Sequence, residues 1–251
     1  VANQAFFNQG NTVNRGFDTR LPGVTDSQVK DAIAEALNGK EGWTDGVNRL
    51  YVVLAQDFMY QDATRNVVFL DNHDMSRFYS VVGEDFNKFK AGMAVLLTMR
   101  GIPQLYYGDE ILMKNYSNPD GLVRLDFPGG WSGDKTDKFT AQGRSKKENE
   151  AFNYIRTLAN YRKATPALQT GRLMQYIPRN GIYVYFRYDA QKTVMVVYNS
   201  NDKAATTTTE RFTERMNGFN RAIDVITGQQ AGNLKQLAIP AKTTLIYELK
   251  K

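Results

Sequence analysis

The residue types best suited to chemistry in this 251-residue chain stand together at Asp71-Asn72-His73-Asp74. They follow Asn66–Leu70, an unbroken β-branched and aromatic run that predicts a strand buried on both faces, as in a parallel sheet. Polar side chains at the carboxyl end of such a strand lie where barrel enzymes hold their active sites. His73 is the only histidine. A lone histidine is more often structural, but its place beside Asp74 favours a site.

The elements around this run alternate between strands and helices. Apolar spacing and capping residues predict a helix from Asp26 or Ser27 to Gly39. The remaining elements predicted for this half of the chain are strands at 17–21, 66–70 and 102–107 and helices at 46–60, 85–99 and 146–163. This order predicts three βα units of a parallel sheet. A closed (β/α)₈ barrel needs eight such units, so five would lie upstream.

The pattern changes after Pro166. Apolar and polar residues then alternate in short runs that are separated by Gly, Asn, Asp and Pro, which is typical of antiparallel strands. These runs lie at 172–177, 181–188, 193–199, 221–227 and 243–249. The sequence therefore predicts two domains, an α/β part at 1–165 and an antiparallel β-sandwich at 166–251.

Several motifs resemble those of the α-amylase superfamily, glycoside hydrolase family 13. Leu70–Asp74 is similar to the motif of barrel strand seven in that family, and Gly101–Glu110 is similar to the motif of strand eight. The segment 17–22 occupies the place of strand six. The run 118–131 resembles the strand-eight loop of the neopullulanase and cyclomaltodextrinase subgroup. The resemblance implies the C-terminal portion, about units six to eight, of a (β/α)₈ barrel, followed by a β-sandwich.

The resemblance also implies roles for four residues. Asp74 matches the carboxylate that stabilises the transition state by binding sugar hydroxyls, and His73 matches the neighbouring donor to the same sugar. Asp120 and Arg124 match a pair that grips glucose units on the non-reducing side. Gly121 stands where many members have Pro, which makes the placement of Asp120 less secure.

Other polar and aromatic residues near these motifs allow two interpretations. Arg77 is either a partner for a neighbouring carboxylate or a structural cation. Asp109 and Glu110 are interpreted as scaffold for the strand-eight loop rather than as an acid–base pair. Trp131 and Tyr116 either stack on glucan or fill the loop, because flat aromatic faces serve both purposes.

The resemblance implies a retaining hydrolase of α-1,4-linked glucans such as cyclomaltodextrins, pullulan and malto-oligosaccharides. Retaining hydrolysis requires a nucleophile and a proton donor. The family takes them from an Asp after strand four and a Glu after strand five, and neither motif has a match between Val1 and Phe17. The isolated chain is therefore expected to be inactive and to associate with a missing N-terminal half or with itself. The alternative is a carbohydrate-binding or scaffolding module without catalysis.

Composition excludes several other functions. Cysteine is absent, which excludes disulfides and thiolate chemistry and fits either the cytoplasm or the periplasm. The net charge of +6 is scattered along the chain, which argues against a nucleic-acid partner. No apolar run reaches the length of a membrane span, and the N-terminus does not resemble a signal peptide. The sequence implies no cofactor. Calcium occurs in the family, but no clear cluster of ligands stands out here.

Overall fold

Three short parallel segments form the centre of the N-terminal half of the computed structural model, which describes residues 21–251. Thr25 pairs in parallel with Val67, and strand β1 (Val67–Val68) pairs in parallel with β2 (Ile102–Pro103). The parallel pairing expected from the apolar runs is present, but each ladder is shorter than the run that predicts it. The strand expected at 17–21 lies almost wholly outside the described residues.

The helices after these segments begin at acidic caps. The carboxylate of Asp26 accepts a hydrogen bond from Val29 at the start of α2 (Ser27–Asn38), and the helix stops at Gly39, as predicted. Asp85 caps α5 (Phe86–Thr98) in the same way. The short helix α4 (Phe78–Val81) was not expected from the sequence.

The helix predicted over 46–60 is shorter than its pattern suggests. Helix α3 (Val47–Leu54) ends early, and the 3₁₀ turn η1 (Asp57–Met59) follows it. Apolar spacing over 46–60 predicts that Phe58 lies on the same buried face as Val47, Leu50 and Leu54, but this prediction is wrong, because Phe58 is 65% exposed. The chain turns there because the carboxylate of Asp57 binds the buried guanidinium of Arg100.

The last long helix ends the N-terminal half. Helix α6 (Lys146–Lys163) begins with a reciprocal capping box between Ser145 and Glu148, as the polar start of this segment suggests. The short α7 (Pro166–Gln169) follows it, with Pro at the first helical position. Three further 3₁₀ turns lie in the connecting loops: η2 (Ala63–Arg65), η3 (Asp109–Ile111) and η4 (Leu122–Arg124).

An antiparallel sheet of five strands occupies the C-terminal region, as predicted. Its order is β3 (Arg172–Arg179), β4 (Ile182–Tyr188), β5 (Thr193–Asn199), β9 (Thr243–Lys250) and β7 (Arg221–Asp224). Asn180 and Gly181 join the first two strands with positive φ angles of 52° and 73°, the backbone of a tight hairpin. The sequence did not reveal the pair β6 (Ala205–Thr208) and β8 (Gln236–Ile239), nor the short η5 (Glu210–Phe212) and α8 (Thr213–Met216).

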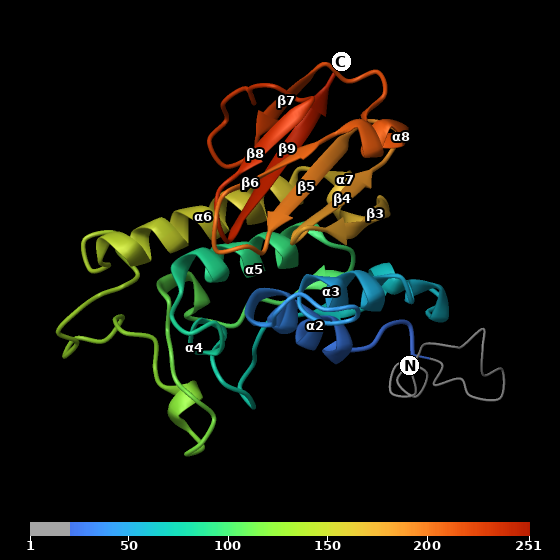
Figure 1. Cartoon of the computed structure of the whole chain (residues 1–251). Coiled ribbons are helices and arrows are strands. Elements are labelled where there is room, and N and C mark those ends of the chain that lie inside the picture. Colours follow the sequence, from blue (N-terminus) through green and yellow to red (C-terminus); the bar gives the residue numbers. More distant parts are fainter. Residues whose placement is uncertain (1–20) are drawn as a thin grey trace.

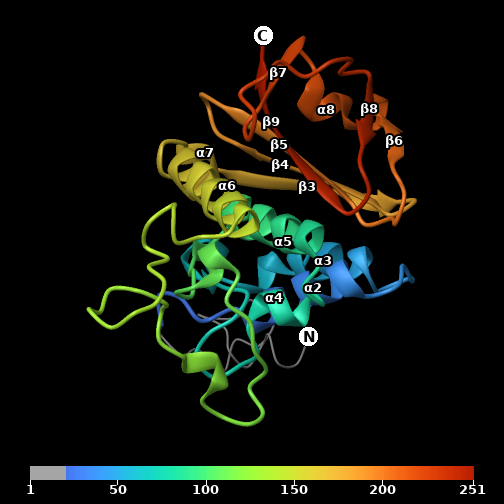
Figure 2. The same ribbon diagram turned by 90° about the vertical axis from the view of Figure 1, so that its left-hand side faces the viewer.

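The five-stranded sheet has two buried faces. Figures 1 and 2 both show α5 and α6 lying between this sheet and the group formed by α2, α3 and α4. The face toward the helices joins their apolar core through alternating residues such as Tyr183, Tyr185 and Val196. The opposite face packs with Phe212 and Leu237 from the segment that contains β6 and β8. The helices and the sheet therefore share one continuous core.

Three buried arginines hold the turn between α5 and β2. Arg162 donates to the carbonyls of Leu97, Met99 and Gly101, and Arg187 donates to the carbonyl of Thr98. These carbonyls end a helix, where positive charge is favourable. The third arginine is Arg100. Burial lowers the pKa of Arg162 to about 10 and that of Arg187 to about 9.

Arg100 differs from the other two because it binds carboxylates. Its guanidinium lies 2.8 Å from Asp26 Oδ2 and grips both carboxylate oxygens of Asp57. Asn66 also donates to Asp26, at 3.3 Å. Burial opposes the charge of Arg100, but the Asp57 and Asp26 carboxylates outweigh it and raise the pKa of the guanidinium. The cluster therefore ties the start of α2, the end of α3 and the entry to β2 at one point.

Removing this arginine should strongly destabilise the chain. Arg100→Met leaves two carboxylates without their shared cation, and breaking a buried pair in this way costs roughly 3–5 kcal/mol. The midpoint of urea unfolding should fall accordingly, while Lys135→Met on the exposed loop should leave it nearly unchanged. An equal midpoint for the two variants would show that the cluster contributes nothing.

Candidate functional site

The loop after β1 brings two of the predicted residues to the surface. Phe69 and Leu70 are buried, and the chain then turns outward through Asn72, whose side-chain oxygen accepts from the backbone N–H of Asp74 at 2.9 Å. The side chains of His73 and Asp74 are 64% and 63% exposed, with His73 Nε2 3.2 Å from Asp74 Oδ2. A buried strand thus presents an imidazole and a carboxylate side by side.

Arg124 reaches the same place from the loop after β2. Its Nε donates to the carbonyl of His73 at 2.8 Å, and one Nη lies 3.4 Å from Asp74 and 3.2 Å from Asp120. The structure therefore gathers all four residues singled out in the sequence, although up to 51 positions separate them along the chain. Both loops extend away from the five-stranded sheet (Figure 1).

Gly121 permits the turn that brings Arg124 into this cluster. Its φ angle is 95°, a value that proline cannot adopt, and its carbonyl accepts from the N–H of Arg124 at 2.9 Å. The replacement of Pro by Gly at this position therefore coincides with a left-handed turn. Asp120 remains within reach of Arg124 despite that departure.

A buried layer of charge lies beneath the exposed cluster. Arg77 is fully buried, donates to the carbonyl of Tyr107 at 2.6 Å, and lies 4.0 Å above the centre of the Tyr106 ring. Asp71 and Asp109 are also buried, and their carboxylates feel the charge of this arginine. The sequence left Arg77 ambiguous and indicated that Asp109 is scaffold. It placed Asp71 in the same motif as Asp74 but gave no sign that Asp71 is buried while Asp74 is exposed.

Two exposed aromatic residues stand on the loop after β2. The side chain of Trp131 is largely exposed, and that of Tyr116 is exposed except for its hydroxyl, which lies 3.4 Å from the carbonyl of Ser80. Trp131 does not fill the interior of the loop. Its flat face is available to a ligand, as that of a sugar-stacking residue would be.

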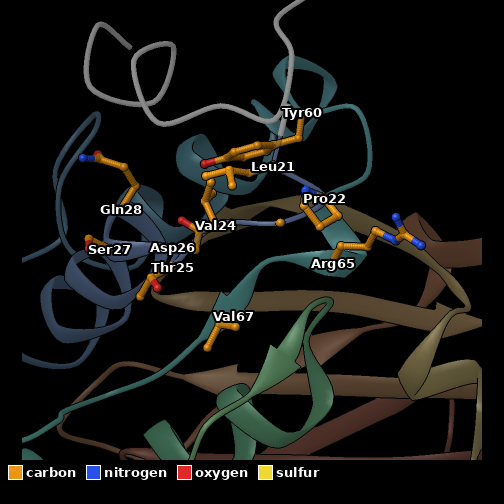
Figure 3. A pocket seen from close by; sticks show the side chains of 11 residues that line it. Leu21, Pro22, Val24, Thr25, Asp26, Ser27, Gln28, Tyr60, Arg65 and Val67 are labelled. Carbon is orange, nitrogen blue, oxygen red and sulfur yellow. The ribbon is translucent and has the colours of Figure 1, made fainter. Parts of the chain in front are cut away.

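A hollow of about 660 Å³ lies elsewhere. Its lining includes Pro22, Val24, Thr25, Arg65 and Val67 (Figure 3). The hollow lies beside the parallel segment around Thr25, and the loops that carry His73 and Arg124 do not border it. A large apolar hollow often marks a ligand site. His73, Asp74, Asp120 and Arg124 do not line this hollow, and we place the candidate site at that four-residue cluster.

Within residues 21–251, no group of three or more His, Asp or Glu side chains is arranged to hold a metal ion. None of the helices in this part of the chain is both long enough and apolar enough to cross a bilayer.

Two known families match this chain. The family described as "Alpha amylase, catalytic domain" matches residues 43–127, a segment that includes the whole candidate site. The family described as "Cyclo-malto-dextrinase C-terminal domain" matches residues 173–248, the antiparallel region. The chain belongs to the α-amylase superfamily.

Curated relatives agree with this assignment. The chain is 32% identical over 142 residues to an α-amylase of Niallia circulans, an alignment that spans 57% of this chain and 24% of the relative. It is 30% identical over 176 residues to a cyclomaltodextrin glucanotransferase of Geobacillus stearothermophilus, over 70% of this chain and 22% of the relative. The chain thus spans about a quarter of the length of these relatives.

Solved structures of superfamily members have the same fold. An α-amylase from Geobacillus thermoleovorans, complexed with acarbose, superimposes with a TM-score of 0.72 at 20% identity, covering 92% of this chain and 48% of the other. A cyclomaltodextrin glucanotransferase with a three-domain ABC distribution gives 0.70 at 25% identity, covering 96% and 46%. The chain corresponds to about half of each structure.

Arg124 should contribute little to folding. Its ion pairs with Asp74 and Asp120 are exposed, and such pairs are worth about 0–1 kcal/mol. We therefore expect Arg124→Ala to shift the melting temperature by no more than about 4 °C. Arg179→Ala, which changes another exposed arginine, is the matched control and should cause a similarly small shift. A loss as large as that of a core truncation, measured by calorimetry, would show that Arg124 is structural.

Proposed function

We propose that this chain supplies the sugar-gripping side of the active site in a retaining α-glucan hydrolase. The observation that carries the proposal is the meeting of His73, Asp74, Asp120 and Arg124 through contacts of Arg124 with the other three. Membership of the α-amylase superfamily supports it. Under this proposal the glucan lies across the exposed loops after β1 and β2.

Asp74 is proposed to act on the sugar ring at the cleavage point. Glycoside hydrolysis passes through an oxocarbenium-like transition state, which a fixed anion and hydroxyl contacts stabilise. The Asp74 carboxylate projects from a loop that is anchored on a buried strand, so its position is constrained. His73 lies beside it and can donate to a hydroxyl of the same glucose unit.

Arg124 and Asp120 are proposed to hold a neighbouring glucose unit. A guanidinium and a carboxylate together offer several donors and acceptors to sugar hydroxyls, and bonds to charged groups are the stronger ones. Arg124 binds both Asp120 and Asp74 in the structure, which keeps the three side chains together. A sugar would replace some of these contacts.

We infer that the substrates are α-1,4-linked glucans such as cyclomaltodextrins, pullulan or malto-oligosaccharides. The match of 173–248 to a cyclomaltodextrinase C-terminal domain favours the hydrolase subgroup. Several relatives, such as that of Bacillus licheniformis at 28% identity, are cyclomaltodextrin glucanotransferases, which favours transfer between glucans. Hydrolysis is our proposal, and transglycosylation is the second outcome that a product analysis would distinguish.

The nucleophile and proton donor are proposed to come from residues beyond these 251. In this proposal 1–165 forms about units six to eight of a (β/α)₈ barrel, and 166–251 forms the C-terminal domain. Ile102 on β2 is 55% exposed, and Leu105 just beyond it is also exposed. Exposed apolar residues of this kind are expected where another part of the protein packs against the surface. The packing partner is the rest of the barrel or a second copy of this chain.

A carbohydrate-binding or scaffolding module remains the alternative function. The exposed face of Trp131 serves that function as well as catalysis, because stacking on glucose needs no acid–base group. The two functions differ in whether the nucleophile and the proton donor are present in the same assembly.

The first test of the proposed catalytic function concerns Asp74 in an assembly that also contains the nucleophile and the proton donor. Asp74→Asn keeps the shape and removes the anion, so turnover of maltoheptaose should fall by roughly 10²–10⁴. Asp202→Asn, on a fully exposed turn of the C-terminal region, is the matched control and should retain turnover. Near wild-type turnover in Asp74→Asn would remove this residue from the mechanism.

The second test concerns a polypeptide of these 251 residues alone. Because it offers no match to the nucleophile and proton-donor motifs, it should release no measurable reducing sugar from malto-oligosaccharides. Light scattering should show association rather than a 28.4 kDa monomer, because apolar residues such as Ile102 are exposed. Clear hydrolysis by a purified monomer would contradict both expectations.

A further inference from the structure

Asp71, Arg77 and Asp109 form a buried group with incomplete pairing. The exposed fractions of these residues are 1%, 0% and 3%. Among the described residues, Oδ1 of each carboxylate and both Nε and Nη2 of Arg77 are without hydrogen-bond partners. The remaining Nη donates to the backbone of Tyr107 rather than to either acid. The charge of one buried guanidinium therefore acts on two buried carboxyl groups, although it forms no ion pair with either among the described residues.

The two carboxyl groups lie close enough to share a hydrogen bond. An ionised carboxylate has no donor, so such a bond requires a proton on one of the two groups. Burial, and then the charge of Asp71, raise the pKa of Asp109 far above its ordinary value. Burial also raises the pKa of Asp71, against the N–H of Phe78 and the charge of Arg77, which lower it.

The pair joins the two loops that carry the candidate site. Asp71 precedes His73 and Asp74, and its Oδ2 accepts from the N–H of Phe78 at 2.7 Å, which closes the loop between them. Asp109 begins the segment after β2 that continues to Asp120 and Arg124, so that a contact between Asp71 and Asp109 fixes one loop against the other.

We propose that Asp71 and Asp109 form a carboxyl–carboxylate pair that shares one proton, is buried near the charge of Arg77, and acts as a positioning element for His73 and Asp74. The positioning part rests on the proposed function of the exposed cluster. The shared proton does not, because it follows from the burial and chemistry of the pair itself.

Within residues 21–251, Arg77 is the one cation whose charge acts on the pair. The Tyr106 and Tyr107 rings cover Arg77, and Glu110, next to Asp109, adds a further negative charge that raises the pKa of Asp109. Glu110 instead accepts from the N–H of Gly108 at 2.9 Å. One positive charge therefore faces more than one acid, which favours retention of a proton.

Replacement of one acid by its amide tests the shared proton. The folded-state pKa of the pair is raised, so its contribution to stability is present below the ordinary carboxyl pKa and is lost as pH rises through the raised value. Asp109→Asn cannot ionise and should avoid that loss. Relative to wild type, its melting temperature should rise by at least about 3 °C between pH 5 and pH 8.

Two controls accompany that measurement on the 251-residue chain. Asp71→Asn should show the same trend, because the proton belongs to the pair. Asp202→Asn, which changes a carboxylate that is 91% exposed, should give a difference from wild type that does not vary with pH. If the difference in melting temperature from wild type does not vary with pH for either Asp109→Asn or Asp71→Asn, the shared proton is overturned.

The positioning role is tested through His73, whose imidazole gives a unique NMR signal because the chain has no other histidine. In Asp109→Asn the side-chain amide can still donate to Asp71, so the chemical shift of His73 should stay unchanged. Asp109→Leu removes the bond and should change that chemical shift. Val197→Ala, in the core on the far face of the sheet, should destabilise the fold without moving the signal.

The outcomes separate the two parts of the inference. A His73 signal that stays at its wild-type position in a folded Asp109→Leu variant would overturn the positioning role. If Asp109→Leu does not fold, the smaller change Asp109→Ala replaces it: a shifted His73 signal in the folded variant supports that role, and an unshifted one overturns it. Neither measurement involves a glucan, so both results can be interpreted even if the proposed function fails.

Discussion

The turn between α5 and β2 depends on buried guanidinium groups. Arg162 and Arg187 satisfy the carbonyls at the end of α5, and Arg100 neutralises Asp26 and Asp57. The three arginines come from α6, β4 and the turn itself, so helices and sheet are fixed against one another at one place. Buried charges persist only when paired or fully hydrogen-bonded, which makes this arrangement specific to one relative placement of the elements.

The candidate site is built on the side that this arrangement leaves free. Asn66 and Arg100 directly precede β1 and the turn into β2, and both bind Asp26 at the start of α2, while the loops after β1 and β2 extend away from the sheet. Arg124 can therefore reach His73 and Asp74 without disturbing the core. Stability is concentrated at one end of the strands and potential chemistry at the other, which is the usual division in α/β barrels.

The contrast between Asp71 and Asp74 shows how burial divides similar residues between different roles. Asp74 is exposed and bound by Arg124 and His73, whereas Asp71 lies in the interior and closes the loop through Phe78. Asp74, which a ligand can reach, and Asp71, which contacts only neighbouring residues, are three positions apart in the chain. A buried acid beside a second acid retains a proton, because the interior cannot hold two unscreened negative charges.

The sequence alone determined the local elements and the identity of the exposed cluster. Helices α2, α5 and α6 begin where Asp26, Asp85 and Ser145 cap them, because capping is a local interaction. Tertiary structure decided what depends on distant partners. The early end of α3 follows from the contact of Asp57 with Arg100, 43 positions away, and the pairing of β6 with β8 follows from the apolar face that they cover. The approach of Asp71 to Asp109 belongs to the same class. Sequence spacing carries no signal for such contacts, since burial and charge compensation are properties of the assembled core.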